Sequence, residues 1–317
     1  MERELKSLYL PENLAGERID LALSRVTGLS RNVISNLMEN SEVRLVKSNQ
    51  PLLKSYKVLG GELIEILLPK PTTTDRIIPT PYLDSAGEAA LPIVFQDSDL
   101  VVVDKPVGMA AHASVSWKGP TVIGALVAMG INIETGGIAE RQGIVHRLDV
   151  GTSGLMMVAK SERAYSNLKD QFRNRNVKKI YWALVQGQMD PSEGTIDAPI
   201  DRHPKADYKF AVISSGKKSI SHYKSLEFFS GMTLVEVELE TGRTHQIRVH
   251  FSALSHPLIG DNIYGADPVV SEKLGITRPW LHAHNLEFNH PVTGELLTFT
   301  SPLPSDLASS LATLRSR

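Results

Sequence analysis

The sequence predicts an α+β protein in which a small module of helices and strands precedes a larger domain with a mostly antiparallel sheet. Many short strand-like segments occur among few helices, without the strand–helix–strand rhythm that builds parallel sheets. At 317 residues the chain is long for a single hydrophobic core, so two domains are expected. Hydrophobic residues at 42% and charged residues at 22% are ordinary values for a globular protein.

The composition excludes several kinds of chemistry. The chain has no cysteine, so disulfides, thiol nucleophiles, iron–sulfur clusters and cysteine-ligated zinc are excluded. Lys and Arg number 34 against 35 Asp and Glu, so any basic surface must be local. The charged N-terminus lacks the apolar core of a secretory signal, and no apolar run reaches the roughly 20 residues that span a bilayer. We therefore expect a cytoplasmic protein that does not bind a membrane.

Residues 14–70 predict a compact module of two helices and two strands. Apolar residues at helical spacing predict one helix over 17–26, and Ser30 can cap a second helix with Ile34 and Leu37 on its apolar face. Strands are expected at 43–46 and 63–68, around a polar hairpin. Eight Lys or Arg against six Asp or Glu give a surplus of two, which by itself favours a solvated face over an RNA-binding surface.

The segment after this module is predicted to be a linker. It is rich in proline and threonine and shows little periodic pattern. We place the domain boundaries at residues 1–70, 71–91 and 92–317, and we expect the two domains to hinge on one another.

The second domain is predicted to contain many strands and a few capped helices. Strands are expected at 93–95, 100–103, 178–186, 209–213, 219–226 and 233–240. Thr121, Ser161 and Thr244 stand where a side chain can cap a helix, and residues 304–314 predict a surface helix. In the strand at 178–186, Tyr181 and Trp182 must point to opposite faces.

The densest positive charge lies at residues 160–179. This stretch holds seven Lys or Arg and two Asp or Glu, a surplus of five. Such a run is as typical of a solvated helix face as of a nucleic-acid contact. Its position beside the most polar turn of the chain favours the contact.

Residues 143–160 contain the turn around which the chain is organised. Apolar segments at 144–145 and 155–159 are predicted as buried strands, and the turn between them carries Arg147 and Asp149. On an alternating backbone, residues two apart share a face, so a base-reading cation and a reactive carboxylate could address one substrate. On these residues alone, a capped turn with a solvated ion pair is an equally good interpretation.

A second polar cluster follows the strand expected at 233–240. Arg248 lies one turn inside the helix that Thr244 would cap. Bidentate contact of Arg248 with Asp149 would keep the acid ionised and fix its direction. The alternative is a helix-surface Arg248 paired with Glu238 or Glu240.

Three motifs in this order resemble the signatures of the RluA-type pseudouridine synthases. They are His146-Arg147-Leu148-Asp149 with Thr152-Ser153-Gly154, Lys179-x-Tyr181-x-Ala183-Leu184-Val185, and Gly242 through His250. The flanking patterns match at Lys105-Pro106-x-Gly108, Leu281-His282-Ala283 and His290-Pro291. The resemblance covers essentially the whole chain. It implies a mostly antiparallel, mixed-sheet catalytic domain that works without a cofactor.

The resemblance also implies roles for individual residues. Asp149 would be the catalytic carboxylate, either attacking the ribose or removing a proton from it, and Arg248 would pair with it. Tyr181 would stack on the target base, and Arg147 would enter the space vacated by a flipped uridine. Further RNA-binding or base-flipping contacts are implied for His146, Thr152, Lys179, Arg243, His245 and Gln246.

The N-terminal module resembles the S4 RNA-binding domain. The matching segments are Arg18-Ile19-Asp20, Leu29-Ser30-Arg31, Val43 and Leu59-Gly60-Gly61-Glu62. The resemblance implies that Arg31 and its neighbours face phosphates, through contacts that position RNA rather than read its sequence.

Two local features need separate interpretation. Val150-Gly151 departs from the charged or polar residues that many family members carry after the Asp, which could alter contacts to flanking nucleotides. The histidines between 245 and 290 lack the spacing of a metal site, so structural hydrogen-bonding roles are favoured.

The leading hypothesis is a cytoplasmic, monomeric RNA pseudouridine synthase that acts on large-subunit ribosomal RNA, without DNA as a partner. An S4-type RNA-binding or ribosome-assembly protein with an inactive catalytic domain is the alternative from another class. A nucleoside or RNA glycosidase with Asp149 as nucleophile is the third, and it predicts release of free uracil.

Overall fold

The computed structural model describes residues 3–10, 12–27, 31–69, 91–113, 117–133, 135 and 142–316. The chain forms two compact units, which are described separately here. The predicted linker at 71–91 lies outside the described residues except for Leu91, so the domain boundaries stay predictions. No helix in the described ranges is long and apolar enough to cross a membrane.

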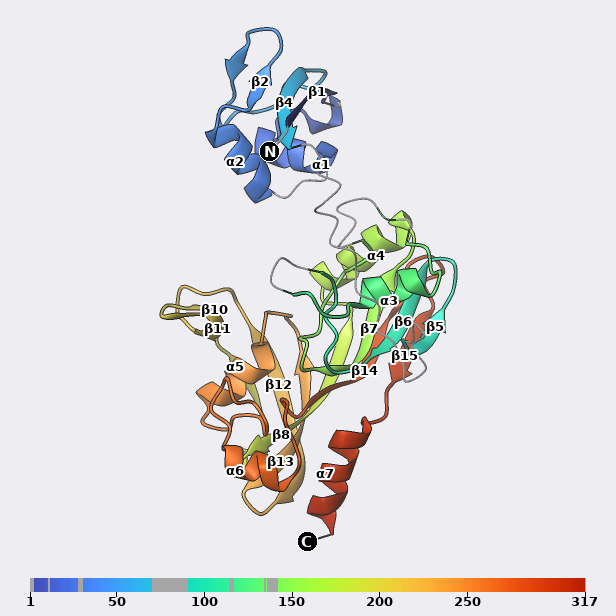
Figure 1. The fold of residues 1–317 in the computed structure, drawn as a ribbon, viewed down its shortest axis with the longest axis vertical. Coiled ribbons are helices and arrows are strands. Elements are labelled where there is room, and N and C mark those ends of the chain that lie inside the picture. The colour runs from blue at the N-terminus through green and yellow to red at the C-terminus, as the bar shows by residue number, and fades with distance from the viewer. Residues whose placement is uncertain are drawn as a thin grey trace. The chain divides into compact units, whose positions relative to one another are not determined.

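The first unit is a four-stranded antiparallel sheet with two helices packed on it (Figure 1). Its elements are β1 (Arg3–Tyr9), η1 (Glu12–Leu14), α1 (Ile19–Thr27), α2 (Arg31–Glu39), β2 (Val43–Leu45), β3 (Gln50–Pro51) and β4 (Leu63–Pro69). Both predicted helices and both predicted strands are present, whereas β1 and β3 were not expected. Apolar residues of the helices, among them Ile19, Leu23 and Ile34, pack on Ile64 and Ile66.

Three residues of the S4 resemblance, Leu29, Ser30 and Arg31, fall at the edge of what the structure describes. Ser30, the predicted cap of the second helix, lies outside the described residues. Arg31 is the first residue of α2, but its side chain is not among those described.

The second unit is built on a nine-stranded sheet. Its strands are β5 (Ile93–Gln96), β6 (Leu100–Lys105), β7 (Ser153–Ala159), β8 (Lys178–Gln186), β9 (Glu193–Asp197), β12 (Ile220–Phe229), β13 (Met232–Leu239), β14 (Leu281–Asn289) and β15 (Leu296–Thr300). A separate hairpin is formed by β10 (Ile200–His203) and β11 (Ala206–Val212). The helices are α3 (Val122–Ala128), α4 (Glu162–Arg173), α5 (Gln246–Ala253), α6 (Pro268–Lys273) and α7 (Ser305–Arg315).

The sheet is almost entirely antiparallel, as predicted. Its order is β5-β6-β7-β14-β8-β13-β12-β9, with β15 paired to the outer part of β14, and the only parallel pair along it is β7 with β14. Strand β14 lies between β7 and β8 although it follows them by about a hundred residues in the chain (Figure 1). The sequence did not predict β14, because His282, His284 and Asn285 interrupt its apolar pattern.

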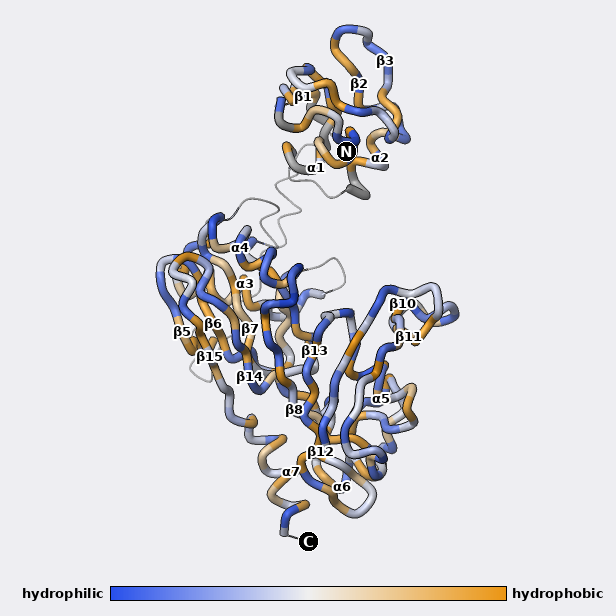
Figure 2. Tube along the Cα trace, turned by 180° about the vertical axis from the view of Figure 1, so that it is seen from behind, coloured by the Kyte–Doolittle hydropathy of each residue, from blue (hydrophilic) through white to orange (hydrophobic). Residues whose placement is uncertain are grey.

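Helices cover both faces of this sheet. On one face α3 and α5 bury Leu126 and Phe251 against alternate residues of β6, β7, β8 and β13. On the other face α4 packs through Leu168 and α7 packs through Leu311. A fully buried leucine of this kind typically contributes roughly 2–5 kcal/mol relative to alanine. Figure 2 shows how hydrophobic much of β6 and β7 is between these layers.

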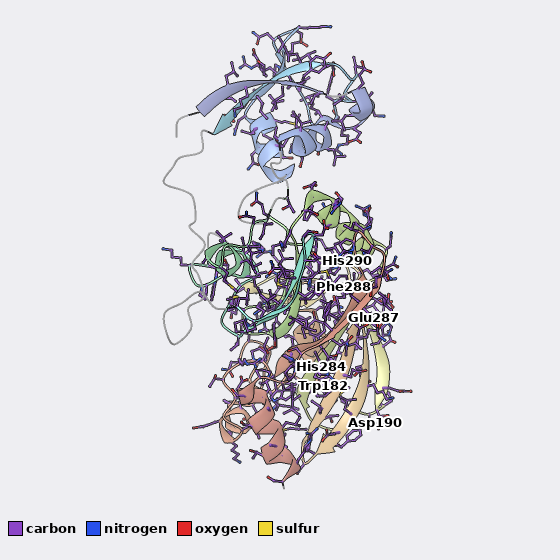
Figure 3. All side chains as sticks on the ribbon, turned by 90° about the vertical axis from the view of Figure 1, so that its right-hand side faces the viewer. Trp182, Asp190, His284, Glu287, Phe288 and His290 are labelled. Atoms are coloured by element: carbon purple, nitrogen blue, oxygen red, sulfur yellow. The ribbon has the colours of Figure 1, made fainter. Side chains whose placement is uncertain are left out.

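Side-chain alternation along β8 confirms the prediction for its aromatic pair. Tyr181 joins the core on the α3 and α5 face. Trp182 joins the α7 face, where its ring stacks on His284 of β14 with centroids 4.0 Å apart (Figure 3).

Two of the three predicted helix caps are confirmed. Thr121 Oγ1 accepts a hydrogen bond from Gly124 N at 2.9 Å, and Ser161 Oγ accepts one from Ala164 N at 3.2 Å. The Thr244 cap is wrong, because α5 starts at Gln246 and His245 occupies the capping position without a side-chain cap. The strand predicted at 144–145 is also wrong, since Ile144 forms only an isolated bridge to Val158.

Candidate active site

The loop at 146–152 is held through its backbone carbonyls by Gly108, by the Arg278 side chain and by a turn within the loop. Gly108 N donates to Val150 O at 2.8 Å, Arg278 Nη1 donates to Gly151 O at 3.4 Å, and Thr152 N closes a turn onto Asp149 O at 3.0 Å. The loop has no strand backbone, so the expected alternation of Arg147 and Asp149 on one strand face is not what places them.

The Thr-Ser-Gly end of the loop enters β7 where that strand meets β14. Gly154 has φ +113°, and a Cβ atom there would lie 2.3 Å from Ala283 O. Only glycine allows this approach. Ser153 Oγ lies 3.1 Å from His282 Nδ1, whose ring also reaches Ser301 O from Nε2 at 3.2 Å. These contacts fix the rigid strand end behind Asp149.

Asp149 faces a buried guanidinium group. Its Oδ2 lies 3.5 Å from Arg248 Nη1, and the carboxylate side chain is 16% exposed. Arg248 lies on the first turn of α5 and is 7% exposed. The expected Arg248–Asp149 contact is therefore present, although it is long and monodentate.

Arg248 makes its bidentate contact with a residue that the sequence analysis missed. Its Nε and Nη2 donate to Asp261 Oδ2 and Oδ1 at 2.6 and 2.8 Å, and Asp261 is 1% exposed. Burial by itself would lower the pKa of Arg248, but the hydrogen bonds and charge of Asp261, with the charge of Asp149, raise it. Arg248 therefore stays charged beside Asp149.

His245 and Tyr264 complete this group. His245 Nε2 lies 3.8 Å from Asp149 Oδ2, and His245 Nδ1 lies 2.8 Å from the hydroxyl of Tyr264. The Tyr264 ring lies 4.9 Å below the Arg248 guanidinium group. Burial lowers the pKa of His245, so the imidazole is neutral near pH 7.

Tyr181 lies on β8 at the wall of the same hollow. It is 7% exposed, and burial, with a smaller contribution from the charge of Asp149, raises the pKa of its hydroxyl. The phenol is therefore neutral at physiological pH.

Two adjoining hollows meet at these residues. The inner one has a volume of about 60 Å³ and is lined by Asp149, Tyr181, His245 and Arg248, among others. The outer one, of about 680 Å³, shares Arg147, Tyr181 and Arg243 with it. A third hollow of about 240 Å³ reaches the other side of Arg147, which is exposed where all three meet.

The outer hollow is lined by cations, but several of them already have protein partners. Arg175 pairs with Glu240 at 2.6 Å, and Arg243 Nε donates to Lys218 O at 3.1 Å. Arg163, also in the basic run, is bidentate to Asp99, so the surplus of five is partly compensated. Lys179 is buried below the Phe172 ring, and burial lowers its pKa to about 8.

The structure places the other predicted residues in different roles. Gln246 is buried, and its amide bonds Ile220 O, Ser221 Oγ, Thr241 Oγ1 and Arg243 N at 2.8–3.0 Å. His146 accepts from Met157 N at 3.0 Å and stacks on Phe172, and burial lowers its pKa to about 3. Thr152 is buried and lines the inner hollow.

The remaining histidines form structural hydrogen bonds, as expected. His250 lies 2.9 Å from Ser221 Oγ, His256 contacts Gln186 O at 2.7 Å, and His284 contacts Ser301 O at 2.8 Å. Among the residues that the structure describes, no group of three or more His, Asp or Glu side chains is arranged to hold a metal ion.

Asp261 and Tyr264 were not among the predicted site residues. Both belong to the polar, glycine-flanked stretch 260–265, which follows an apolar segment in the same way as the turn around Asp149. That local composition is the signal that could have marked them.

Comparisons with known proteins agree on one family. Residues 99–253 match the family described as RNA pseudouridylate synthase. An uncharacterized RNA pseudouridine synthase of Mycobacterium tuberculosis (strain CDC 1551 / Oshkosh) is 50% identical over 98% of both chains. The ribosomal large subunit pseudouridine synthase D of Nitrosomonas europaea is 40% identical over 97% of this chain and 87% of that protein. The solved structure of human RNA pseudouridylate synthase domain containing 1 is similar with a TM-score of 0.55 and 28% identity, over 72% of this chain and 96% of that one.

Proposed function

This chain belongs to the RNA pseudouridylate synthase family, whose members isomerise uridine in RNA to pseudouridine, and we propose that Asp149 is the carboxylate that acts on the target nucleotide. One observation carries this assignment. Asp149 is a partly exposed carboxylate in a half-open hollow, 3.5 Å from a buried arginine that is already neutralised by a second carboxylate. Such a group is ionised, directed and reachable by a single nucleotide.

The reaction breaks the C1′–N1 bond of uridine and forms a C1′–C5 bond, the hydrogen at C5 leaves as a proton, and N1 takes up a proton, so that the product is an isomer of the substrate. Asp149 would either attack the ribose or remove a proton from it, and both routes need the ionised carboxylate. Arg248 supports that charge state. Tyr181 would stack on the uracil ring and hold it while it turns between the two bonds.

Arg147 would enter the stack when the uridine leaves it. Its side chain is exposed and lines all three hollows, including the inner one that Asp149 also lines. A base within a helix or loop cannot reach the carboxylate until it is unstacked, at a cost of a few kcal/mol. An inserted guanidinium group can offset part of that cost through stacking and phosphate contact.

The outer hollow would hold the RNA backbone around the target. Lys179 and Arg243 line it and would contact phosphates, together with Arg147. His146, Thr152 and Gln246 would support these contacts by fixing the two loops that carry them.

For the substrate we propose large-subunit ribosomal RNA. The support is the Nitrosomonas europaea relative named ribosomal large subunit pseudouridine synthase D, which aligns over nearly the whole of this chain. The first unit, which resembles an S4 domain, would grip the RNA outside the active site, and the enzyme would work as a monomer in the cytoplasm.

Release of tritium tests the catalytic assignment. Large-subunit RNA labelled with tritium at uridine C5 is incubated with the wild-type protein and with Asp149→Asn. The wild type should release label to the solvent and the variant should not. Release of free uracil would instead identify a glycosidase, and no release from naked RNA or subunits would identify an inactive RNA-binding protein.

A charge reversal tests the role of the first unit. Lys47→Glu combined with Lys57→Glu changes two exposed residues there. The double variant should bind large-subunit RNA more weakly and with a shallower salt dependence, while a short target oligonucleotide is turned over as before. Unchanged affinity would contradict the S4 assignment.

A further inference from the structure

His245 occupies the N-cap position of helix α5, but its imidazole does not cap the helix. His245 precedes α5 with φ +57°, a left-handed conformation that is rare outside glycine, asparagine and aspartate. A residue at this position usually accepts a hydrogen bond from the first turn of the helix, but His245 makes no such cap. Its ring is instead directed towards Tyr264 and Asp149. A strained backbone without a side-chain cap is typical of a residue whose side chain has a functional role.

Two aromatic rings hold the imidazole in place. Phe210 of β11 and Tyr264 both meet it edge-on, with ring centroids 5.7 and 5.6 Å away. His245 therefore has one orientation, and its two nitrogens face different partners. Nδ1 faces the Tyr264 hydroxyl at 2.8 Å, and Nε2 faces Asp149 at 3.8 Å.

The hydrogen bonds of the Tyr264 hydroxyl decide which nitrogen carries the proton. Phe210 N donates to this oxygen at 2.9 Å. Among the residues described, the other hydrogen-bond partner of the hydroxyl is His245 Nδ1. If Nδ1 carried a proton, the oxygen would accept two hydrogen bonds and its own hydrogen would have no acceptor there. The satisfied arrangement has the hydroxyl donating to Nδ1, which leaves the proton on Nε2.

Nε2–H therefore projects into the inner hollow next to Asp149. At 3.8 Å from Asp149 Oδ2 it is beyond hydrogen-bond distance of the carboxylate. Both groups line the space that the target nucleotide would fill. The donor is thus placed to meet the substrate and not to neutralise the acid.

We propose that His245 is a neutral hydrogen-bond donor to an oxygen of the ribose on which Asp149 acts, and that Tyr264 is the positioning residue that keeps the donor proton on Nε2. This inference rests on the proposed role of Asp149. It gives the implied RNA contact of His245 a donor atom and an acceptor, and it adds Tyr264 as a positioning residue that the sequence motifs do not assign.

The tautomer can be read directly in the free enzyme. In protein labelled with ¹⁵N at histidine, the His245 signals are identified by their loss in His245→Asn. Wild-type His245 should show a protonated Nε2 and an unprotonated Nδ1 at pH 7.5. Tyr264→Phe, which keeps the ring under Arg248, should introduce the Nδ1–H form. A wild-type His245 protonated at Nδ1 would overturn the proposal.

Matched variants of His245 test the substrate contact. The amide nitrogen of glutamine can take the place of Nε2, whereas that of asparagine reaches only to Nδ1. Asparagine also tolerates the left-handed backbone well, so its effect is not attributable to misfolding. His245→Asn should lower kcat by about 10²-fold, a typical loss for one aligned donor, with unchanged RNA affinity. His245→Gln should recover at least half of that loss on a logarithmic scale.

Tyr264→Phe should lower kcat less than His245→Asn does. Equal kcat for His245→Asn and wild type, or the same loss in the Gln and Asn variants, would reject the donor role. These outcomes are distinct from failure of the proposed function, in which the wild type itself releases no tritium while the tautomer measurement is unaffected.

Discussion

Two loops of the catalytic unit present a carboxylate to the same arginine, and they hold it very differently. Asp261 is 1% exposed and bidentate to Arg248 at 2.6 and 2.8 Å. Asp149 is 16% exposed and lies 3.5 Å from a single nitrogen. The first carboxylate has geometry typical of a structural ion pair, whereas the second keeps lone pairs free for a ligand.

This difference shows how one buried arginine can stabilise the Asp149 carboxylate and still leave it open to a ligand. Asp261 offsets the cost of burying Arg248 and fixes the direction of its guanidinium group. The remaining Nη1 then acts on Asp149 from a fixed place. Separating the two carboxylates experimentally should therefore separate stability from activity.

Asp149→Asn should have the largest effect on catalysis and little effect on stability. Turnover should fall by at least about 10³-fold, because a central reacting group is lost. The midpoint of urea unfolding should stay close to that of the wild type, since Arg248 keeps Asp261. A large drop in stability would mean that Asp149 is as structural as Asp261.

Asp261→Asn should show the opposite pattern. Removing one partner of a buried ion pair typically costs about 3–5 kcal/mol, because the other charge stays buried. Urea unfolding followed by circular dichroism measures this loss. Turnover should also fall because Arg248 is no longer held. Stability equal to that of Asp149→Asn would contradict the distinction between the two carboxylates.

The variant Arg248→Lys tests whether a single ammonium group pairs with Asp149 or with Asp261. Lysine cannot make the bidentate contact and serve a second acid, so we expect it to stay with Asp261. The variant should lose less stability than Asp261→Asn and should have a kcat lower by roughly 10- to 100-fold. Full activity with low stability would show that Asp149 is the preferred partner.

The smallest expected effect is on RNA affinity and concerns Lys179. Unlike Arg248, this cation is buried without a bidentate carboxylate partner among the described residues. Burial lowers its pKa to about 8, against a smaller opposing effect of Glu238. The ammonium group is charged below that pH and loses its proton above it. RNA affinity should therefore fall between pH 7 and 9, by about fivefold at most for one partly screened contact.

Lys179→Arg is the control for this titration, because arginine stays charged throughout the range. Its affinity should not show the step near pH 8. A wild-type affinity that is flat from pH 7 to 9 would exclude Lys179 as a phosphate contact.

The helix caps and strand β8 were predicted correctly because each depends on residues that are close together in the chain. Thr121 and Ser161 cap their helices because the hydroxyl and the amide it satisfies are three residues apart. Strand β8 was predicted with its observed bounds, because apolar residues run through it between polar ends. The Asp149–Arg248 contact joins residues 99 positions apart. Residue chemistry left Glu238 and Glu240 open as partners of Arg248, and the family resemblance favoured Asp149.

What the sequence missed depends on contacts between distant segments. Asp261 and Tyr264 lie in a stretch without regular structure, and their partners Arg248 and Phe210 belong to other elements, 13 and 54 residues away in the chain. His245 replaces Thr244 at the start of α5 because the buried amide of Gln246 anchors the preceding turn to Ile220 and Ser221. The helix, strand and capping propensities of single residues contain no information about contacts between segments.

The place of β14 in the sheet has a consequence for biosynthesis. Strand β7 can pair with β6, and β8 with β13, before β14 is made, but β7 and β8 cannot be joined in one sheet until residues 281–289 have been translated. Arg278, just before β14, also joins Asp306 of α7 to the Gly151 carbonyl beside Asp149. A nascent chain therefore cannot carry a finished active site. We expect the loop that carries Asp149 to reach its final form only after Asp306 has been made.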